Sequence, residues 1–429
     1  MRRLRILHVT PYSGEAWAYG GIPRVVAALT SGLADRGHDV TICATDAGGP
    51  ATRLAAAART FHAWPAVRTR DGVTLRVFPN LSNRAAYGAQ LFLPIGLRRF
   101  LRRHAGEFDV AHLHACRNFP GVIAAHCLRA AGVPYVVAPN GTAPVIERRR
   151  MAKRAFDLLF AQRPLAGAAR VIAVSEAERT QLHQLEVPEA AIRVVPNPID
   201  LSEFSPAPAR GRFRPKLVPP NARIVMFLGR LSPRKRVDDL IAAFARLRAT
   251  GRFSNSWLIV AGNDMGSGGR IRSLLSDAGL VGCSSMVGLL QGRQRLEALA
   301  DADVLVYPSQ QEIFGLVPLE ALLAGTPVVV ADDSGCGEVI SSVGGGAVVP
   351  AGDVEALMSA IAAALDDPER HRSGAIEAAA RVRERYSRDA VCRALEEVYL
   401  ELCPSPALAS QQAAPPRSST RAIRAGVAG

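Results

Sequence analysis

Residues 303–331 read DVLVYPSQQEIFGLVPLEALLAGTPVVVA, and this stretch decides the fold. The apolar run from Asp303 to Tyr307 predicts a strand. After a polar loop, Pro318 suits the first turn of a helix, and Gly325-Thr326-Pro327 ends that helix before a second apolar run. Strand, loop, helix and strand in this order form the repeating unit of a parallel sheet with helices on both faces.

The same alternation extends over most of the chain. Further apolar runs predict strands over residues 4–9, 39–44, 110–114, 135–138, 171–174, 223–229, 257–261 and 327–331. Between the two halves, residues 205–221 contain five prolines and several basic residues without an acid, which is typical of a linker. We therefore predict an N-terminal α/β domain over residues 1–204, a linker over 205–221, a C-terminal α/β domain over 222–387 and a disordered tail over 404–429.

Composition narrows the class of protein. The 429 residues hold 52 Lys and Arg against 38 Asp and Glu, a formal net charge of +14, which favours nucleic acid, an anionic membrane or a phosphorylated substrate as partner. A chain with 48% hydrophobic and 21% charged residues is not wholly disordered, collagen-like or coiled coil. Its seven cysteines never show C-x-x-C spacing, so neither a zinc site nor a disulfide framework is expected. No apolar run reaches the length of a membrane span, so we expect a cytoplasmic protein.

Two basic residues after one predicted strand suit an anion. Arg230 stands at the end of the 223–229 run, and Lys235 comes just before the next helix. The forked donors of Arg, the point charge of Lys and the free amides of a helix N-terminus together can bind a phosphate. The alternative is a solvated basic turn.

Two carboxylates follow the next strand. Glu312 lies in the loop and Glu320 on the helix, with seven residues between them. Each can accept hydrogen bonds from hydroxyl groups on a different part of one ligand, and Gly315 allows close approach of the backbone. The alternative is that both are ordinary surface charges. One glutamate alone would favour that interpretation, but the whole sequence from Glu312 to Glu320 favours a ligand site.

The string EIFGLVPLEALLAGTPVV, which begins at Glu312, resembles the signature of the retaining glycosyltransferases of family 4. The stretches LHVTPYSG (7–14), YGGIPRVVAALTSGLADRGHDVTI (19–42), VVPNPID (194–200) and RIVMFLGRLSPRKRVDDLIAAF (223–244) resemble the same family, in its order, and the similarity covers roughly residues 4–400. The resemblance implies a GT-B fold, in which two Rossmann-like parallel-sheet domains face a central cleft, and a bacterial-type enzyme that uses a nucleotide-sugar.

The resemblance also implies roles for single residues. Arg230 and Lys235 would bind the diphosphate of the donor, Glu320 the ribose hydroxyls and Glu312 the hydroxyls of the transferred sugar. The remaining donor-binding candidates are the backbone of Ile313, Phe314, Gly315, Leu316 and Val317, together with Gly20 and Gly21 from the N-terminal domain. A last helix over residues 388–403 would pack back onto the N-terminal domain.

Two further candidates follow strands of the N-terminal half. Val110, His112 and His114 share one face of a strand because side chains alternate with a period of two. By the resemblance His114, nearer the carboxyl end, sits beside the transferred sugar, and we count it with Glu312, Arg230 and Lys235 as candidate catalytic residues. A purely structural role is the alternative and suits His112 better. Asn140 stands where the family often has His, so we expect it to bind the donor without transferring a proton.

These features predict a retaining hexosyltransferase that acts without a metal or other cofactor. It would move a hexose-type sugar from a nucleotide-sugar to a hydroxyl of a glycan or lipid-linked acceptor, in the synthesis of cell-surface polysaccharide or glycolipid. The alternatives are a nucleotide-sugar epimerase of the same fold and a catalytically idle nucleotide-sugar-binding protein.

Other motifs have simpler interpretations. Asp301-Ala302-Asp303 resembles the metal-binding D-x-D of a different transferase fold, but its place at a helix end favours a structural role. Ser175 to Glu178 reads as a helix capping box. The basic clusters Arg98, Arg99, Arg102, Arg103 and residues 147–154 predict peripheral attachment to the anionic inner face of a membrane, with a solvated face as the alternative. Nucleic acid is not expected as a partner, because no matching motif accompanies the charge.

Overall fold

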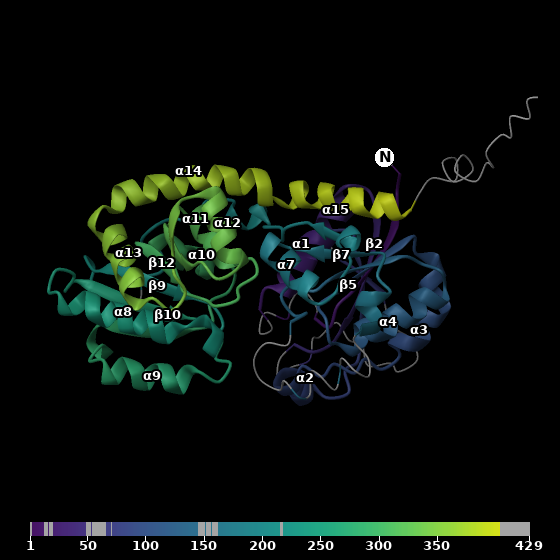
Figure 1. Cartoon of the computed structure of the whole chain (residues 1–429), viewed down its shortest axis with the longest axis horizontal. Coiled ribbons are helices and arrows are strands. Elements are labelled where there is room, and N and C mark those ends of the chain that lie inside the picture. The colour runs from purple at the N-terminus through teal and green to yellow at the C-terminus, as the bar shows by residue number, and fades with distance from the viewer. Residues whose placement is uncertain are drawn as a thin grey trace, which may run out of the picture.

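The computed structural model describes residues 2–12, 16, 20–48, 53, 66–69, 71–144, 151, 156, 162–214 and 218–403. The predicted tail and most of the basic segment 147–154 lie outside these residues. Two α/β domains lie side by side, and two long helices run across both of them (Figure 1). No helix among the described residues has the length and apolar character needed to span a bilayer.

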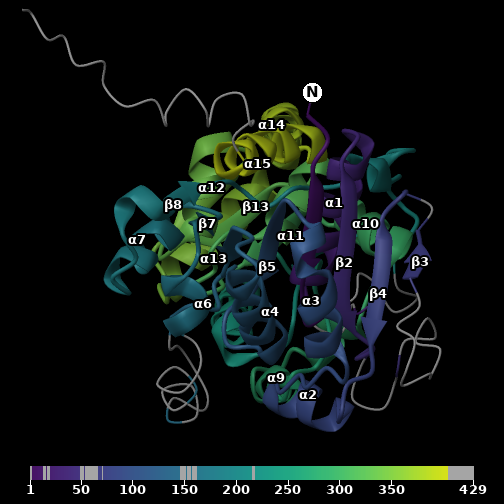
Figure 2. The same cartoon turned by 90° about the vertical axis from the view of Figure 1, so that its right-hand side faces the viewer.

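The N-terminal domain contains a sheet whose described strands run in the order β3-β4-β2-β1-β5-β6-β7-β8, visible edge to edge in Figure 2. Its strands are β1 (Arg5–Val9), β2 (Asp39–Thr45), β3 (Ala66–Arg68), β4 (Thr74–Phe78), β5 (Val110–His114), β6 (Tyr135–Ala138), β7 (Arg170–Ala173) and β8 (Ile192–Val194). Its described helices are α1 (Ile22–Asp35), α2 (Asn83–Ala89), α3 (Leu97–His104), α4 (Phe119–Ala130), α6 (Gln162–Ala166) and α7 (Glu176–Gln184). Neighbouring strands are parallel except for β3 beside β4.

The C-terminal domain has a parallel sheet in the order β11-β10-β9-β12-β13-β14. Its strands are β9 (Arg223–Leu228), β10 (Ser256–Ala261), β11 (Ser284–Gly288), β12 (Val304–Tyr307), β13 (Val328–Ala331) and β14 (Gly346–Val349). The helices around it are α8 (Val237–Ala249), α9 (Gly268–Asp277), α10 (Gly292–Asp301), α11 (Leu316–Leu323), α12 (Gly335–Val343) and α13 (Val354–Asp366). The predicted fold class, two parallel-sheet α/β domains, is confirmed.

The strands that periodicity missed lie at or near the sheet edges. β8, β11 and β14 are only partly buried, whereas β5, β6, β12 and β13 are buried along their whole length. A strand covered on both faces must be apolar throughout, and an edge strand need not be. The continuous apolar run therefore identifies central strands alone.

The described part of the predicted linker is docked on the C-terminal domain. The amides of Phe213 and Arg214 donate to Asp301 Oδ2 at 2.8 and 3.0 Å, and Asp303 Oδ2 accepts from the amide of Ile224 at 2.7 Å. These bonds account for both carboxylates of the D-x-D sequence. They also tie residues 211–214 of the predicted linker to the domain that follows.

The chain crosses between the domains at two adjacent points. Ile199 donates its amide to Tyr386 O at 2.7 Å and accepts from the amide of Arg388 at 3.2 Å. There α14 (Pro368–Tyr386), on the C-terminal domain, is followed by α15 (Arg388–Leu402), which lies against the N-terminal domain (Figure 1). Paired crossings of this kind are where one domain could turn relative to the other.

A buried carboxylate attaches α15 to the N-terminal domain. Glu396, whose side chain is 2% exposed, accepts from Arg36 Nη2 at 2.5 Å and lies 2.9 Å from His38 Nε2. Around it, Val391, Leu395 and Tyr399 belong to the same apolar core as β1. The ion pairs therefore lie inside a packed interface.

Replacing Glu396 by Ala should lower the unfolding free energy by about 3 kcal/mol, because it leaves the buried His38 without its carboxylate and Arg36 with only the exposed Asp389. Glu401→Ala is the matched control on the same helix. Its side chain is 46% exposed beside Arg170 and Arg193, and its loss should cost about 0.5 kcal/mol. Urea unfolding followed by circular dichroism measures both variants, and equal losses would contradict this account of the interface.

Candidate functional site

The candidate site begins with an ion pair at the carboxyl ends of β9 and β12. Lys235 ends the short helix η6 (Pro233–Lys235), and its ammonium group donates to Glu312 Oε2 and to the hydroxyl of Tyr307. The same carboxylate oxygen accepts from Tyr307 at 3.2 Å and from Ser309 Oγ at 3.1 Å. The Lys235 ammonium also lies 4.5 Å from the centre of the Tyr307 ring. The cation and the carboxylate are therefore fixed in place before any ligand arrives.

The charges of this pair are set by burial and by basic neighbours. Burial alone would raise the pKa of Glu312, but Lys235, Arg234 and Arg230 outweigh it and lower that pKa to about 2. Burial lowers the pKa of Lys235, and Glu312 partly offsets the shift. Glu312 is thus ionised at neutral pH. The side chain of its partner Lys235 is only 8% exposed, so the cation is almost removed from water.

The N-terminus of α11 lies next to this pair. Gly315 precedes the helix with φ of 78°, and no side chain caps the helix there. A Cβ at Gly315 would lie 2.5 Å from Cys336 Sγ, so both the backbone angle and the packing require glycine. The loop is held from the other side, since Glu312 O accepts from the amide of Cys336 at 2.8 Å. Uncapped helix amides beside Lys235 form an arrangement suited to a phosphate group.

Glycines of the N-terminal domain lie directly against these residues. A Cβ at Gly20 would lie 3.3 Å from Arg230 Nε, one at Gly21 3.1 Å from Leu316 Cδ1, and one at Gly141 2.9 Å from Ile313 Cγ1. The structure therefore brings the predicted residues of the two domains together. At these points the faces of the two domains touch.

Glu320 lies deeper than the sequence predicted. Its side chain is 1% exposed, Arg24 Nη1 lies 2.6 Å from Oε1, and Arg295 Nη1 contacts Oε2. Burial would raise the pKa of Glu320, but Arg24 and Arg295 outweigh burial and lower it. Sequence reasoning missed both arginines. Arg24 lies in the first turn of α1, directly after the Gly20-Gly21 pair. This position next to predicted donor-binding residues is the sequence feature that could have identified it.

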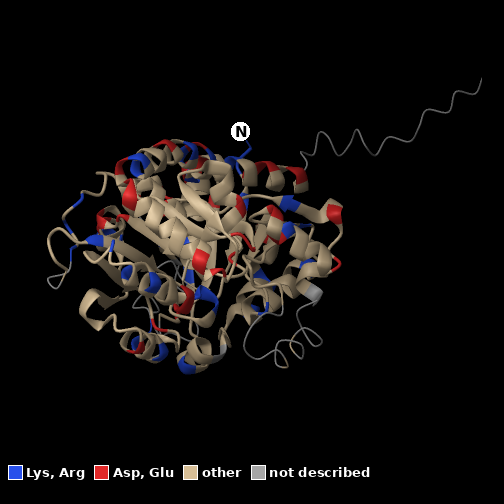
Figure 3. Ribbon diagram, turned by 60° about the vertical axis from the view of Figure 1, so that its left-hand side comes forward, with Lys and Arg blue, Asp and Glu red and all other residues tan. Residues whose placement is uncertain are grey.

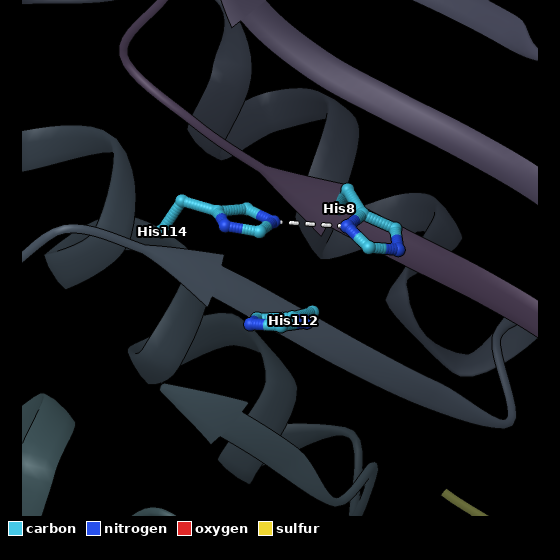
Figure 4. Close-up of side chains that lie close together, drawn as sticks. All are labelled: His8, His112 and His114. Atoms are coloured by element: carbon cyan, nitrogen blue, oxygen red, sulfur yellow. Dashed lines mark hydrogen bonds between the residues drawn. The ribbon is translucent and has the colours of Figure 1, made fainter. Parts of the chain in front are cut away.

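His114 lies in a stack of three histidines (Figure 4). Its Nε2 is 2.9 Å from Nδ1 of His8 on β1, and its ring stacks on His112 with centroids 4.2 Å apart. His112 Nδ1 in turn lies 2.6 Å from the Tyr399 hydroxyl. Burial lowers the pKa of His114 to about 3, so the ring is neutral and can only donate or accept a hydrogen bond.

The ring nitrogens of His8, His112 and His114 lie within 4.8 Å of one another, which makes them a group with metal-ligand spacing among the described residues. All three are at most 1% exposed, and the group includes no carboxylate. Removing a divalent cation from water here, without an anion to neutralise it, would be costly. The arrangement fits a neutral hydrogen-bonded stack better than a metal site.

Asn140 and Gly141 are held in place by a glutamate that sequence reasoning treated as part of a capping box. Ser175 Oγ does accept from the amide of Glu178 at 3.2 Å, as a cap should. The Glu178 carboxylate instead accepts from the amides of Gly141 at 2.6 Å and Val174 at 2.9 Å. It is fully buried, and burial raises its pKa to about 7 despite those two hydrogen bonds. Glu178 thus positions the loop that faces Ile313.

Stability should depend on the ionisation of Glu178. Its folded-state pKa of about 7 exceeds the ordinary 4.5, so its contribution is complete below pH 4.5 and is lost as pH rises through 7. From pH 4.5 to 8 the wild type should lose about 3 kcal/mol of unfolding free energy relative to Glu178→Gln, which cannot ionise. Urea unfolding of both proteins across this range measures the difference. A difference independent of pH would show that Glu178 has an ordinary pKa.

Comparison with known proteins agrees with this geometry. Residues 19–203 match the family described as Glycosyltransferase Family 4, and residues 210–382 match Glycosyl transferases group 1. The chain is 30% identical to the D-inositol 3-phosphate glycosyltransferase of Kineococcus radiotolerans, over 91% of each chain.

Solved structures share the fold. Sucrose-phosphate synthase from Thermosynechococcus elongatus aligns with a TM-score of 0.70 at 20% identity, over 93% of this chain and 99% of that one. An Anabaena protein in complex with UDP and glucose aligns with a TM-score of 0.68 at 20% identity, over 92% and 99%. The two-domain architecture is the GT-B fold, and the chain belongs to the family 4 glycosyltransferases.

Proposed function

We propose that the protein transfers a hexose-type sugar from a nucleotide-sugar donor to an acceptor hydroxyl, with retention of the anomeric configuration and without a metal. The observation that carries the proposal is the ion pair between the buried Lys235 and the partly covered Glu312, beside the uncapped N-terminus of α11. Fixed positive charge and helix amides at one point stabilise the charge that develops on a departing diphosphate.

In this proposal the donor lies along the carboxyl ends of β9 and β12. Lys235 and Arg230 bind the diphosphate together with the amides of α11, and Glu312 accepts hydroxyl hydrogen bonds from the sugar. Backbone atoms between Ile313 and Val317 line the sugar, as the resemblance implies. Gly20 and Gly21 contribute from the N-terminal domain, where they lie close to Arg230 and Leu316. Asn140 contributes from the same domain, next to Gly141.

Retention is proposed from the family 4 resemblance, and it does not require a covalent intermediate on Glu312. Glu312 is held on one oxygen by Lys235, Tyr307 and Ser309, and its lowered pKa makes it a weak nucleophile. In the proposed mechanism the acceptor hydroxyl attacks from the side of the leaving group, which keeps the anomeric configuration, and passes its proton to the departing diphosphate. A neutral His114 orients the sugar through hydrogen bonds and does not act as an acid.

The acceptor binds to the N-terminal domain. The glycosylated product is an intermediate in the synthesis of a cell-surface polysaccharide or glycolipid. The Kineococcus relative is named for D-inositol 3-phosphate, so a polyol phosphate is the first acceptor to test. A glycan or lipid-linked acceptor is the next.

Electrostatic attachment to an anionic membrane forms part of the proposal. Leu97, Phe100 and Leu101 of α3 are buried in the core, so this helix offers arginines alone, with no apolar face to insert. The exposed members are Arg98, Arg99, Arg102 and Arg103. Along much of the ribbon in Figure 3 basic and acidic residues are interspersed. We choose the α3 cluster for the test because its four arginines are exposed on one short helix.

Vesicles of phosphatidylglycerol and phosphatidylcholine should sediment the wild type at low salt, because the arginines neutralise anionic headgroups at about 1 kcal/mol each. The double variant Arg98→Glu and Arg102→Glu should remain in the supernatant, as should the wild type with neutral vesicles. Equal sedimentation of wild type and variant would remove α3 as the membrane contact.

The catalytic proposal is tested with UDP-, GDP- and ADP-sugars in the presence of EDTA. One donor should be hydrolysed slowly by the wild type, and Lys235→Met should lower that rate about 100-fold because it removes the fixed charge at the leaving group. Arg252→Met is the matched control, since this side chain is 66% exposed on the same domain and should not affect the rate.

The same experiment separates the alternatives. Conversion of the donor sugar to its epimer without an acceptor would identify an epimerase, and binding without turnover would identify an idle binding protein. With inositol phosphate or a lipid-linked acceptor added, NMR of the product reads the anomeric configuration. Inversion would contradict the proposed mechanism.

A further inference from the structure

Four charged side chains meet where the two domains touch, and one of them is the carboxylate proposed for the ribose. Arg24 comes from α1, Arg295 from α10, Glu320 from α11 and Glu203 from η5 (Leu201–Phe204), which lies just after the Ile199 crossing. The side chains of Arg295 and Glu320 are 5% and 1% exposed, and that of Arg24 is 17% exposed. Charges this deeply buried are held by one another.

The two arginines bind Glu320 from opposite sides of the domain boundary. Arg295 lies in the same domain as Glu320 and contacts Oε2, so this contact persists wherever the C-terminal domain moves. Arg24 lies in the N-terminal domain and reaches Oε1 at 2.6 Å. The Arg24–Glu320 contact therefore crosses the boundary between the domains.

Glu203 gives each arginine a second carboxylate. Arg24 Nη2 donates to Glu203 Oε2 at 3.1 Å, and Arg295 Nη2 contacts the same oxygen. If Arg24 leaves Glu320, it keeps an ionic partner. The network can therefore exchange one contact without leaving a charge unpaired, which is the expensive outcome in a buried site.

We propose that Arg24 occupies the ribose-binding carboxylate in the donor-free protein and that the donor ribose takes its place on binding. This inference rests on the proposed function, because it assumes that Glu320 receives the ribose. Because the Glu320 side chain is 1% exposed and Arg24 Nη1 lies 2.6 Å from its Oε1, a ribose hydroxyl can reach this oxygen only when Arg24 moves aside. Arg24 then remains on Glu203.

Two consequences follow. Donor affinity is reduced by the free energy of the Arg24–Glu320 contact, since binding must break it. Donor binding and the contact between the domains are also linked, because the same carboxylate serves both. Arg24 therefore affects donor binding although it lies in the N-terminal domain, which in the proposal binds the acceptor.

The test uses UDP, GDP and ADP as probes in isothermal titration calorimetry. Arg24→Met keeps the length and apolar contacts of the side chain but removes its charge, and Arg295 still neutralises Glu320. For the nucleotide that binds, its Kd should fall about ten-fold, equivalent to about 1.4 kcal/mol. Arg36→Met is the matched control at the other end of α1, where the arginine pairs with Glu396; it should leave the Kd unchanged.

A second measurement guards against a general loss of stability. Without nucleotide, Arg24→Met should melt at a lower temperature than the wild type, because the ion pair is lost. With saturating nucleotide this difference should shrink, because the bound wild type has already given up the same contact.

The outcomes are distinct. If Arg24→Met binds the nucleotide more weakly than the wild type or equally well, the proposed role of Arg24 is wrong. If Glu320→Gln also binds the nucleotide more weakly, the proposed donor site is still supported. Glu320→Gln that binds like the wild type overturns the assigned ribose site and this inference with it. A melting difference that does not shrink with nucleotide also overturns the exchange.

Discussion

A carboxylate removed from water needs charged or N–H partners, and this structure depends on how its buried glutamates find them. Glu178, Glu320 and Glu396 are almost fully covered, and Glu312 is about three-quarters covered. Each glutamate has a partner on a segment that is distant from it in the sequence. Together they fix the loop before α11, the loop at Gly141, the contact between the domains and the attachment of α15.

These pairings place the chemistry where parallel sheets present ligands, at the carboxyl ends of the strands. Lys235 and Glu312 lie in the segments that follow β9 and β12, which are neighbouring strands of one sheet. Glycines of the N-terminal domain allow that domain to approach these segments closely. A donor bound there would meet fixed charge and helix amides at its diphosphate and backbone along its sugar. Preorganisation of this kind is what a sugar transfer with a nucleotide leaving group requires.

Much of this could be predicted from the sequence, because local patterns encode local structure. The central strands are continuous apolar runs, and the spacing of Glu312 and Glu320 follows from one loop and one helix. The partners of Glu320 could not be predicted, since Arg24 and Arg295 reach it only through tertiary packing. For the same reason the period of β5 placed His114 on the correct face but could not show that His8 covers it. The docking of residues 211–214 on Asp301 likewise left no local signal.

The central claim is that a nucleotide-sugar binds between η6 and α11. A crystal structure of the protein with the donor selected by hydrolysis tests it most directly. The account predicts that the diphosphate lies within hydrogen-bonding distance of Lys235 Nζ and the first amides of α11, with a sugar hydroxyl on Glu312. A diphosphate bound elsewhere, for example at the exposed arginines of α3, with the Lys235–Glu312 pair untouched, would contradict it.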